Sequence, residues 1–186
     1  MDKLCIGNNT YIDSSCKLSG NIVIGNNCII GPFNVLKNVT IGDNNDITSS
    51  YIEDSKIESN CDIGPFSHIR NNSLIMSNCR IGNYVEIKNS ILHSGVKCAH
   101  LSYIGDCEIG EKTNIGCGVI TANYDGKKKH HTKIGSSCFI GCNSVLIAPL
   151  EIKDNSFIAA GTVVTSSLEK NSFAISRTKL EIKERK

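Results

Sequence analysis

The stretch NIVIGNNCIIGPFNVL, residues 21–36, carries an aliphatic side chain at every sixth residue, namely Ile24, Ile30 and Leu36. Glycine directly follows the first two, which suits a tight corner where a Cβ would crowd the turn. A period of six residues fits neither an amphipathic helix nor a simple alternating strand. The stretch therefore predicts a repeat architecture in which each turn buries its aliphatic residue against the neighbouring turns.

The same spacing of aliphatic residues continues through most of the chain, in steps of six residues with occasional steps of five. If each aliphatic position is called i, the series is Ile6, Ile12, Leu18, Ile24, Ile30, Leu36, Ile41, Ile47, Ile52, Ile57, Ile63, Ile69, Ile75, Ile81, Ile87, Leu92, Cys98, Ile104, Ile109, Ile115, Thr121, Ile134, Ile140, Leu146, Ile152, Ile158 and Val164. Of these 27 positions, 25 are Ile, Leu or Val. We predict an all-β, parallel β-helix of hexapeptide repeats, with three repeats in each coil and about nine coils.

Composition narrows the class of protein. With 186 residues and 40% apolar content, the chain is long enough for one core of ordinary size. A net charge of +2 and an aromatic content of 5% argue against a nucleic-acid-binding protein. No stretch is long and apolar enough to span a membrane, and the N-terminus lacks an apolar signal segment. We expect a cytoplasmic protein that has neither a nucleic acid nor a membrane as its partner.

The ten cysteines follow the repeat instead of a metal-ligand spacing. Six of them occupy position i−2: Cys16, Cys28, Cys61, Cys79, Cys107 and Cys138. Serine and threonine occupy the same position in other repeats, so the position requires a small side chain facing inward. We therefore interpret these cysteines as small core residues and predict no metal site.

Position i+2 forms a column of different character. Residues at this position in successive coils are His100, Cys117, Cys142 and Ala160. One imidazole at the end of a row of small side chains indicates a shallow groove suited to an extended thioester arm. The alternative is an ordinary solvated face of the prism.

Charged residues stack on neighbouring columns. Arg70 and Lys88 both lie at i+1 and are one coil apart, so two cations are expected side by side, which is unfavourable unless an anion binds. His68, Glu86 and Tyr103 follow one another at i−1. The set indicates a site for a phosphorylated sugar, although long polar side chains on a prism can simply be solvated.

The rhythm is interrupted once, by the basic and polar segment 122–133. The step from Thr121 to Ile134 is thirteen residues, one repeat plus seven residues. We therefore predict an extended loop that leaves the prism without disturbing the coil.

Several motifs, in order and at compatible spacing, identify a known family. They are NYVEIKNS, KCAHLSYIGDCEIG, NIGCGVITANYDGKKK, FIGCNSVLIAPL, AAGTVVT and AISR. From about Tyr11 to Arg177 the chain resembles the acetyltransferase half of the bifunctional N-acetylglucosamine-1-phosphate uridyltransferase/glucosamine-1-phosphate acetyltransferase. The resemblance implies a left-handed β-helix, which we assign to residues 1–165, followed by a short C-terminal tail, residues 166–186.

The resemblance also implies roles for individual residues. His100 matches the general base, with Glu86 as a further catalytic residue. The sugar-phosphate contacts are Arg70, Lys88, Tyr103, Asn114 and Lys129. The acetyl-CoA contacts are Cys117, Asn123, Tyr124, Cys142, Ala160 and Arg177.

These assignments imply acetylation of glucosamine-1-phosphate by direct transfer, in the synthesis of UDP-N-acetylglucosamine and cell-wall precursors. His100 would take the proton from the 2-amino group, and Glu86 would orient the imidazole or the sugar. A backbone N–H near Cys117 would hold the oxyanion. Cys117 and Cys142 replace the family's frequent Ala and Ser, but no activating partner is apparent, so we expect no covalent cysteine step. No cofactor is expected beyond the co-substrate acetyl-CoA.

The family further implies a homotrimer with sites at the subunit interfaces, in which the Lys129 loop reaches a neighbouring subunit. Uridylyl transfer is not expected. Three alternatives stay open: a hexapeptide acyltransferase for another amino sugar, a non-catalytic β-helix that serves assembly or regulation, and a zinc hydratase. The last would need three convergent histidines.

Overall fold

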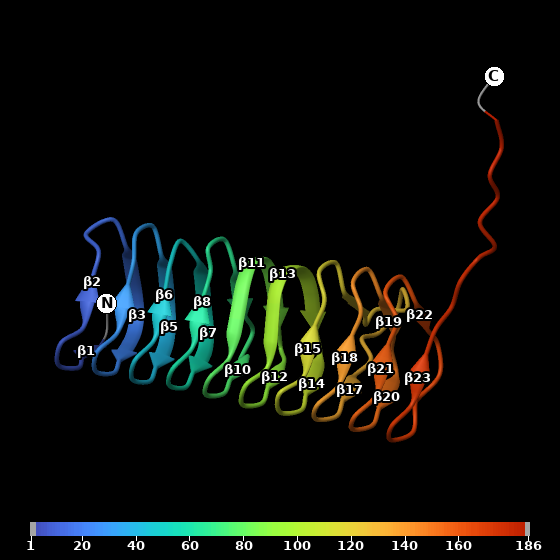
Figure 1. The fold of residues 1–186 in the computed structure, drawn as a ribbon. Coiled ribbons are helices and arrows are strands. Elements are labelled where there is room, and N and C mark those ends of the chain that lie inside the picture. The colour runs from blue at the N-terminus through green and yellow to red at the C-terminus, as the bar shows by residue number, and fades with distance from the viewer. Residues whose placement is uncertain (1–2, 185–186) are drawn as a thin grey trace.

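A computed structural model describes residues 3–184 as a three-sided parallel β-helix (Figure 1). The described residues contain 23 strands and no helix, and therefore no helix that could span a membrane. The three sides of the prism, which we call A, B and C, are each a parallel stack of one short strand per coil. Three long strands, β3, β5 and β7, turn from side B to side C, and two others, β11 and β13, turn from side A to side B.

The strands of side A are β2 (Tyr11–Ile12), β4 (Ile29–Ile30), β6 (Asp46–Ile47), β8 (Asp62–Ile63), the first parts of β11 (Arg80–Lys88) and β13 (Lys97–Gly105), β15 (Asn114–Ile115), β18 (Phe139–Ile140), β21 (Phe157–Ile158) and β23 (Phe173–Ala174). Those of side B are the first parts of β3 (Lys17–Ile24), β5 (Val35–Ile41) and β7 (Tyr51–Ile57), then β9 (His68–Arg70), the second parts of β11 and β13, β16 (Ile120–Ala122), β19 (Val145–Ile147) and β22 (Val163–Val164). Those of side C are β1 (Lys3–Ile6), the second parts of β3, β5 and β7, then β10 (Leu74–Ile75), β12 (Ile91–Leu92), β14 (Cys107–Ile109), β17 (Thr132–Ile134) and β20 (Leu150–Ile152).

The predicted i positions pair with one another from coil to coil. Ile87, for example, pairs with Ile69 of the preceding coil and with Ile104 of the following one. Every i position from Ile24 to Val164 is at most 5% exposed, which confirms the predicted core. Ile6, in the first of the described strands, is 45% exposed.

The two exceptions to the aliphatic rule also lie in the core. Cys98 is fully buried, and burial raises the pKa of its thiol to about 12. The hydroxyl of Thr121 accepts a hydrogen bond from Gly105 N at 2.8 Å and lies 3.0 Å from Gly105 O, so this polar side chain is satisfied.

The cysteines at i−2 confirm the packing interpretation. Five of the six are buried, and Cys16 is partly buried. Their thiols contact backbone carbonyl groups, as Cys28 Sγ does with Gly42 O at 3.1 Å. All ten cysteines are free thiols.

Each corner of the prism contains residues in the left-handed region of backbone conformation. Between sides C and A these are mostly asparagines, which tolerate that region well. Between sides A and B they include Phe33, Phe66, Tyr84 and Leu101, all of them bulky and more than half exposed. This A/B corner therefore carries a row of exposed large side chains, with Phe66 and Tyr84 stacked at a ring distance of 5.5 Å.

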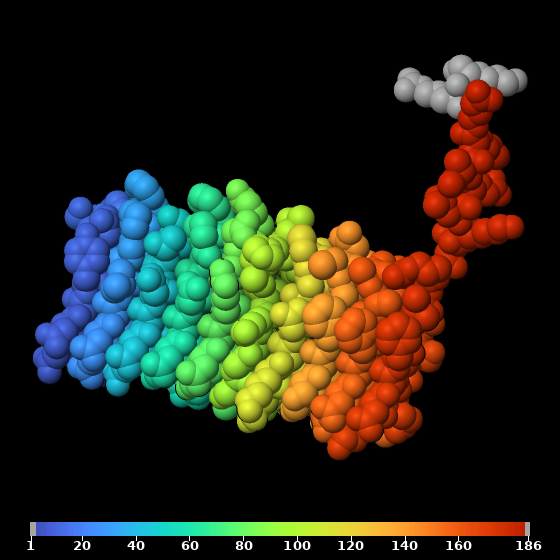
Figure 2. Space-filling view, viewed as in Figure 1, coloured from blue at the N-terminus to red at the C-terminus, as the bar shows by residue number. Residues whose placement is uncertain are grey.

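The coil continues beyond residue 165. Strand β23 pairs with β21, and Leu168 forms a parallel bridge with Ile152, so the prism has about ten turns instead of nine. Residues 166–174 therefore belong to the coil. Ser176 still donates to Thr162 Oγ1 at 3.3 Å and accepts from Val163 N at 3.4 Å, so the segment that leaves the prism starts after this residue. That segment extends away from the end of the prism (Figures 1 and 2).

Candidate active site

Two cations lie side by side on side B, as predicted. Arg70 at the end of β9 pairs in register with Lys88 at the end of β11. Arg70 donates from Nε and Nη2 to Glu86 Oε1, at 2.9 and 2.7 Å. Lys88 Nζ lies 3.0 and 2.9 Å from the two carboxylate oxygens of Asp106. Each cation thus has its own carboxylate, and the expectation that the pair needs a bound anion for its stability was wrong.

Asp106 organises the corner between sides B and C. Its carboxylate accepts hydrogen bonds from Asn89 Nδ2 at 2.6 Å and from Asn123 Nδ2, in addition to Lys88. Burial alone would raise the pKa of Asp106, but these hydrogen bonds and the Lys88 ammonium hold it below its usual value. Asp106 was not among the predicted site residues, although it stands within the motif LSYIGD.

The loop predicted at 122–133 lies between β16 and β17 and folds back on itself. Tyr124 and Lys129 form an antiparallel bridge. Asp125 closes the turn, because its Oδ1 accepts the N–H groups of Lys127 and Lys128, both at 2.8 Å. His130 Nε2 lies 2.7 Å from Asp125 Oδ2, and this contact, with the two backbone bonds, lowers the pKa of Asp125 to about 2.

This turn places Lys129 against Lys88. The proximity of Lys88 lowers the pKa of Lys129, and the Arg70 charge acts in the same direction. Burial alone would lower the pKa of Lys88, but the hydrogen bond to Asp106 and its negative charge raise it. Arg70, Lys88 and Lys129 therefore lie close together. The carboxylates of Glu86 and Asp106 beside them already accept hydrogen bonds from Arg70 and Lys88.

Tyr103 lies on side B next to these cations. Its ring lies over Gly105, where any Cβ would overlap the phenol oxygen and approach Asn123 Nδ2 to 2.8 Å. Glycine at 105 is therefore required for this placement of Tyr103. The ring lines a cavity of about 410 Å³. The lining residues of this cavity, which we call the side-B cavity, are Tyr84, Glu86, Leu101, Ser102, Tyr103, Gly118, Ile120 and Asn143.

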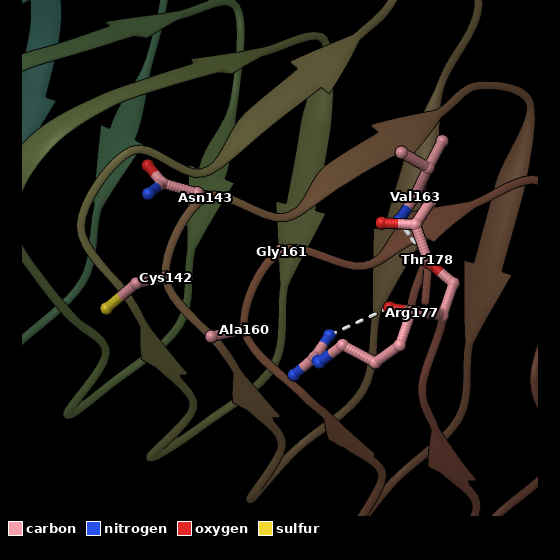
Figure 3. A pocket seen from close by; sticks show the side chains of 8 residues that line it. Cys142, Asn143, Ala160, Gly161, Val163, Arg177 and Thr178 are labelled. Atoms are coloured by element: carbon pink, nitrogen blue, oxygen red, sulfur yellow. Dashed lines mark hydrogen bonds between the residues drawn. The ribbon is translucent and has the colours of Figure 1, made fainter. Parts of the chain in front are cut away.

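A second cavity, of about 650 Å³, lies along the A/B corner toward the C-terminal end (Figure 3). This corner groove is lined by Cys142, Asn143, Ala160, Gly161, Val163, Ser176, Arg177 and Thr178. Figure 3 shows Cys142, Ala160 and the Arg177 guanidinium on neighbouring turns. Asn143 lines both cavities, so the side-B cavity and the corner groove meet at this residue.

The predicted column of small residues is present at this corner. Asn143 N donates to Cys117 O at 2.8 Å, and Gly161 N donates to Cys142 O at 2.7 Å. These bonds hold Cys117, Cys142 and Ala160 on consecutive turns of one corner, as the sequence predicted. Cys142 is exposed and Cys117 is partly buried.

His100 lies at the same corner, one turn before Cys117. It directly precedes Leu101, whose carbonyl accepts a hydrogen bond from Gly118 N at 2.8 Å. The imidazole is exposed, and its Nδ1 lies 3.1 Å from Asn83 Oδ1. The Glu86 carboxylate is hydrogen-bonded to Arg70 and not to this imidazole, and its predicted role in orienting the imidazole or the sugar stays a prediction. Glu86 lines the side-B cavity.

Of the eleven residues with predicted ligand contacts, seven line neither cavity: Arg70, Lys88, Lys129, Cys117, Asn114, Tyr124 and Asn123. Asn114 lies on side A, in register with Lys97 and Phe139. The Tyr124 hydroxyl donates to Gly126 O at 2.8 Å within the loop. Asn123, predicted as an acetyl-CoA contact, is buried and donates to Asp106, which places it at the cation corner.

The backbone around Cys117 offers one free donor. Gly116 N donates to Ile140 O and Gly118 N to Leu101 O, both at 2.8 Å. Within the described chain, the Cys117 N–H between them has no acceptor. The family resemblance implies a backbone N–H near Cys117 for the oxyanion, and this group lies in that place.

Comparison with known proteins agrees with this architecture. The family model "GMPPB C-terminal domain" matches residues 1–77 and 51–124, which together are two thirds of the chain. The model "Bacterial transferase hexapeptide (six repeats)" matches residues 131–166. Relatives described as "Bifunctional protein GlmU" align along nearly the whole chain. The one from Thermoanaerobacter pseudethanolicus is 48% identical over 96% of this chain, and the one from Geobacillus sp. is 46% identical over 96%.

The chain belongs to the hexapeptide-repeat family of the GlmU acetyltransferase domain. It spans only 39% of the length of those two GlmU relatives. Solved structures share the fold of this GlmU-family chain. The UDP-N-acetylglucosamine acyltransferase from Campylobacter jejuni superimposes with a TM-score of 0.63 at 13% identity, covering 88% of this chain and 68% of its own. The Arabidopsis enzyme of the same description has a TM-score of 0.61 at 16% identity and covers 86% of this chain and 69% of its own. The predicted left-handed parallel β-helix is thereby confirmed.

Proposed function

We propose that this chain transfers the acetyl group of acetyl-CoA to the 2-amino group of glucosamine-1-phosphate. The observation that carries the proposal is the junction at Asn143 of two cavities with different chemistry. The side-B cavity lies beside three cations, and the corner groove is lined by small residues and Arg177. An acceptor and a donor bound in these two places would meet near the A/B corner.

The acceptor side suits a phosphorylated amino sugar. Arg70, Lys88 and Lys129 supply cationic donors for a phosphate group, and such charge-assisted bonds are among the stronger polar contacts in proteins. Glu86 and Tyr103 add polar contacts beside the apolar wall of Leu101 and Ile120. A sugar has one apolar face and a polar rim, which matches this lining.

The donor side suits an extended thioester. Cys142, Ala160 and Gly161 leave room for a narrow arm, and Arg177 provides a cation for the phosphates of CoA. The relatives named GlmU support acyl transfer in amino-sugar metabolism as the general reaction.

In the proposed reaction His100 removes a proton from the amine as the nitrogen attacks the thioester carbonyl. The tetrahedral oxyanion is held by the free Cys117 N–H. The C–S bond then breaks, and the sulfur leaves as CoA thiol with the proton that His100 took from the amine. Arg70, Lys88 and Lys129 keep the phosphate fixed during this step.

We further propose that the working form is a homotrimer with composite sites. The side chains of Asn114 and Tyr124 line neither cavity of their own chain, although both match the family's site residues. A neighbouring copy could place these side chains against the cavities, which makes a single chain an incomplete site.

The proposal is tested by measuring CoA thiol release from acetyl-CoA with glucosamine-1-phosphate, glucosamine, glucosamine-6-phosphate or a UDP-amino sugar as acceptor. Fast turnover is expected with the 1-phosphate alone. The His100→Ala variant should still bind acetyl-CoA but lose turnover by ~10²-fold or more. Equal rates with another amino sugar would reassign the acceptor. Full activity of His100→Ala would remove the assigned base.

A further inference from the structure

Asn83 and His100 face each other on consecutive turns of the A/B corner. They are direct partners in the register between β11 and β13. Asn83 Oδ1 lies 3.1 Å from His100 Nδ1. Asn83 is partly buried, whereas the imidazole is exposed, so the amide is the fixed member of the pair.

The backbone holds this pair in alignment. Gly82 packs against the carbonyl of Ala99, and a Cβ at position 82 would overlap that carbonyl. Tyr84 and Leu101, the residues after Asn83 and His100, both have left-handed conformations, with φ values of 58° and 37°. The two turns therefore bend alike and bring the residues at positions 83 and 100 together.

The chemistry of the contact selects one imidazole nitrogen. An amide oxygen can only accept a hydrogen bond, so the Nδ1 facing it carries the proton. The lone pair of the neutral ring then lies on Nε2, on the opposite edge. A neutral acceptor fixes this tautomer without adding the negative charge that would favour the imidazolium.

No charged side chain hydrogen-bonds to His100 within residues 3–184. The titratable groups on the adjacent elements are Arg80, Tyr84, Glu86 and Lys88 on β11, Lys97, Cys98 and Tyr103 on β13, and Cys117 on the next turn. Glu86 is bound by Arg70 at 2.7 Å. Asn83 is therefore the side chain that sets the orientation of the ring.

We propose that Asn83 is a positioning residue that holds His100 as the Nδ1–H tautomer and presents Nε2 as the base. This inference rests on the proposed function, because it assumes that His100 accepts the proton of the amine. Asn83 itself touches neither substrate in this scheme. Its effect passes through the imidazole.

The test compares Asn83→Ala and Asn83→Asp with the unchanged protein. Loss of the acceptor in Asn83→Ala should lower kcat roughly 10- to 100-fold and leave KM for both substrates unchanged. In Asn83→Asp the carboxylate stabilises the imidazolium, so the neutral base forms only at higher pH. The acid limb of the kcat profile should therefore move to higher pH, with recovery of activity on the alkaline side.

A second measurement does not depend on turnover. Nitrogen-15 NMR of the histidine rings should show His100 of the unchanged protein as the Nδ1–H tautomer, and a mixture of tautomers in Asn83→Ala. Asn21→Ala, an exposed asparagine on the first turn of the prism, is the control and should change none of these readouts.

The outcomes separate the two proposals. An inactive His100→Ala protein together with unchanged profiles and tautomer in both Asn83 variants would overturn the role of Asn83 and leave the proposed function intact. Full activity of His100→Ala would overturn the assigned base, whatever the Asn83 variants show.

Discussion

Lys88 Nζ lies 2.9 Å from Asp106 Oδ2 at a corner where only 9% of the lysine side chain and 11% of the aspartate side chain are exposed. The pKa of Lys88 is raised and that of Asp106 is lowered, so both groups are charged over the whole neutral range. Removing one partner of such a pair leaves an uncompensated buried charge. The ion pair with Asp106 therefore has two effects. It stabilises the folded prism, and it holds the Lys88 ammonium in place at the proposed phosphate site.

Replacing Asp106 by asparagine should therefore cost roughly 3–5 kcal/mol of the free energy of unfolding. Urea denaturation at neutral pH measures the loss. The matched control is Asp62→Asn, because Asp62 and Arg80 form an exposed pair 3.7 Å apart with side chains 65% and 62% exposed. That control should lose at most about 1 kcal/mol. Equal losses in the two variants would show that burial of the Lys88–Asp106 pair has no special effect.

The same pair predicts a pH dependence of stability. Because the pKa of Asp106 is lower in the folded chain, its stabilisation is present above the unfolded value of about 3.9 and is lost as pH falls through the folded value. Because the pKa of Lys88 is raised in the folded chain, the stabilisation that its charge contributes is lost only at strongly alkaline pH. Urea denaturation at several pH values should show that the free energy of unfolding falls less at acid pH in Asp106→Asn than in the unchanged protein. If the free energy of unfolding fell equally with decreasing pH in both proteins, the lowered pKa of Asp106 would be contradicted.

Lys129 provides a test of the acceptor site. Lys129→Ala should raise KM for the phosphorylated acceptor and leave KM for acetyl-CoA unchanged, because this lysine faces Lys88 and lines no part of the corner groove. Loss of one charge-assisted bond, at about 1.5–3 kcal/mol, corresponds to roughly 10- to 150-fold in affinity. Lys128→Ala is the control, since the backbone N–H of Lys128 closes the turn and its side chain is exposed. Equal effects of the two substitutions would point to the general charge of the loop.

The fold was predictable because one rule repeats. A buried aliphatic residue every five or six positions fixes which side chains face inward, and the structure confirms this from Ile24 to Val164. The alignment of Arg70 with Lys88, and of Cys117 with Cys142, followed from counting along that repeat. The end of the coil was less clear, because the last turn replaces the aliphatic series by Leu168 and Ala174, which the pattern did not include.

The partners of the site residues were not predictable in the same way. Asp106 reaches Lys88, and Asn83 reaches His100, across neighbouring coils through side chains at corners. Corner conformations depend on left-handed residues such as Leu101 and Asp106 itself, which the hexapeptide period does not specify. The hexapeptide repeat therefore predicts the column in which a residue lies, but it does not determine which side chains on adjacent columns form hydrogen bonds with each other.

Cys142 allows the corner groove to be examined by a thiol reagent. Cys5 and Cys142 are the exposed cysteines of residues 3–184, and six of the others are buried. N-ethylmaleimide should therefore modify these two first, since its reaction requires access to the sulfur. Acetyl-CoA should protect Cys142, which lines the groove, and leave Cys5 unprotected, as peptide mass spectrometry would show.

The Cys142→Ser variant should keep a kcat comparable to that of the unchanged protein, because a hydroxyl fills the same small space and direct transfer needs no thiol. Loss of turnover in this variant, with acetyl-CoA binding retained, would instead require a covalent step at Cys142. Absence of protection at Cys142 would place the thioester outside the corner groove, because a bound arm that passes Ala160 toward His100 must cover the neighbouring turn at Cys142.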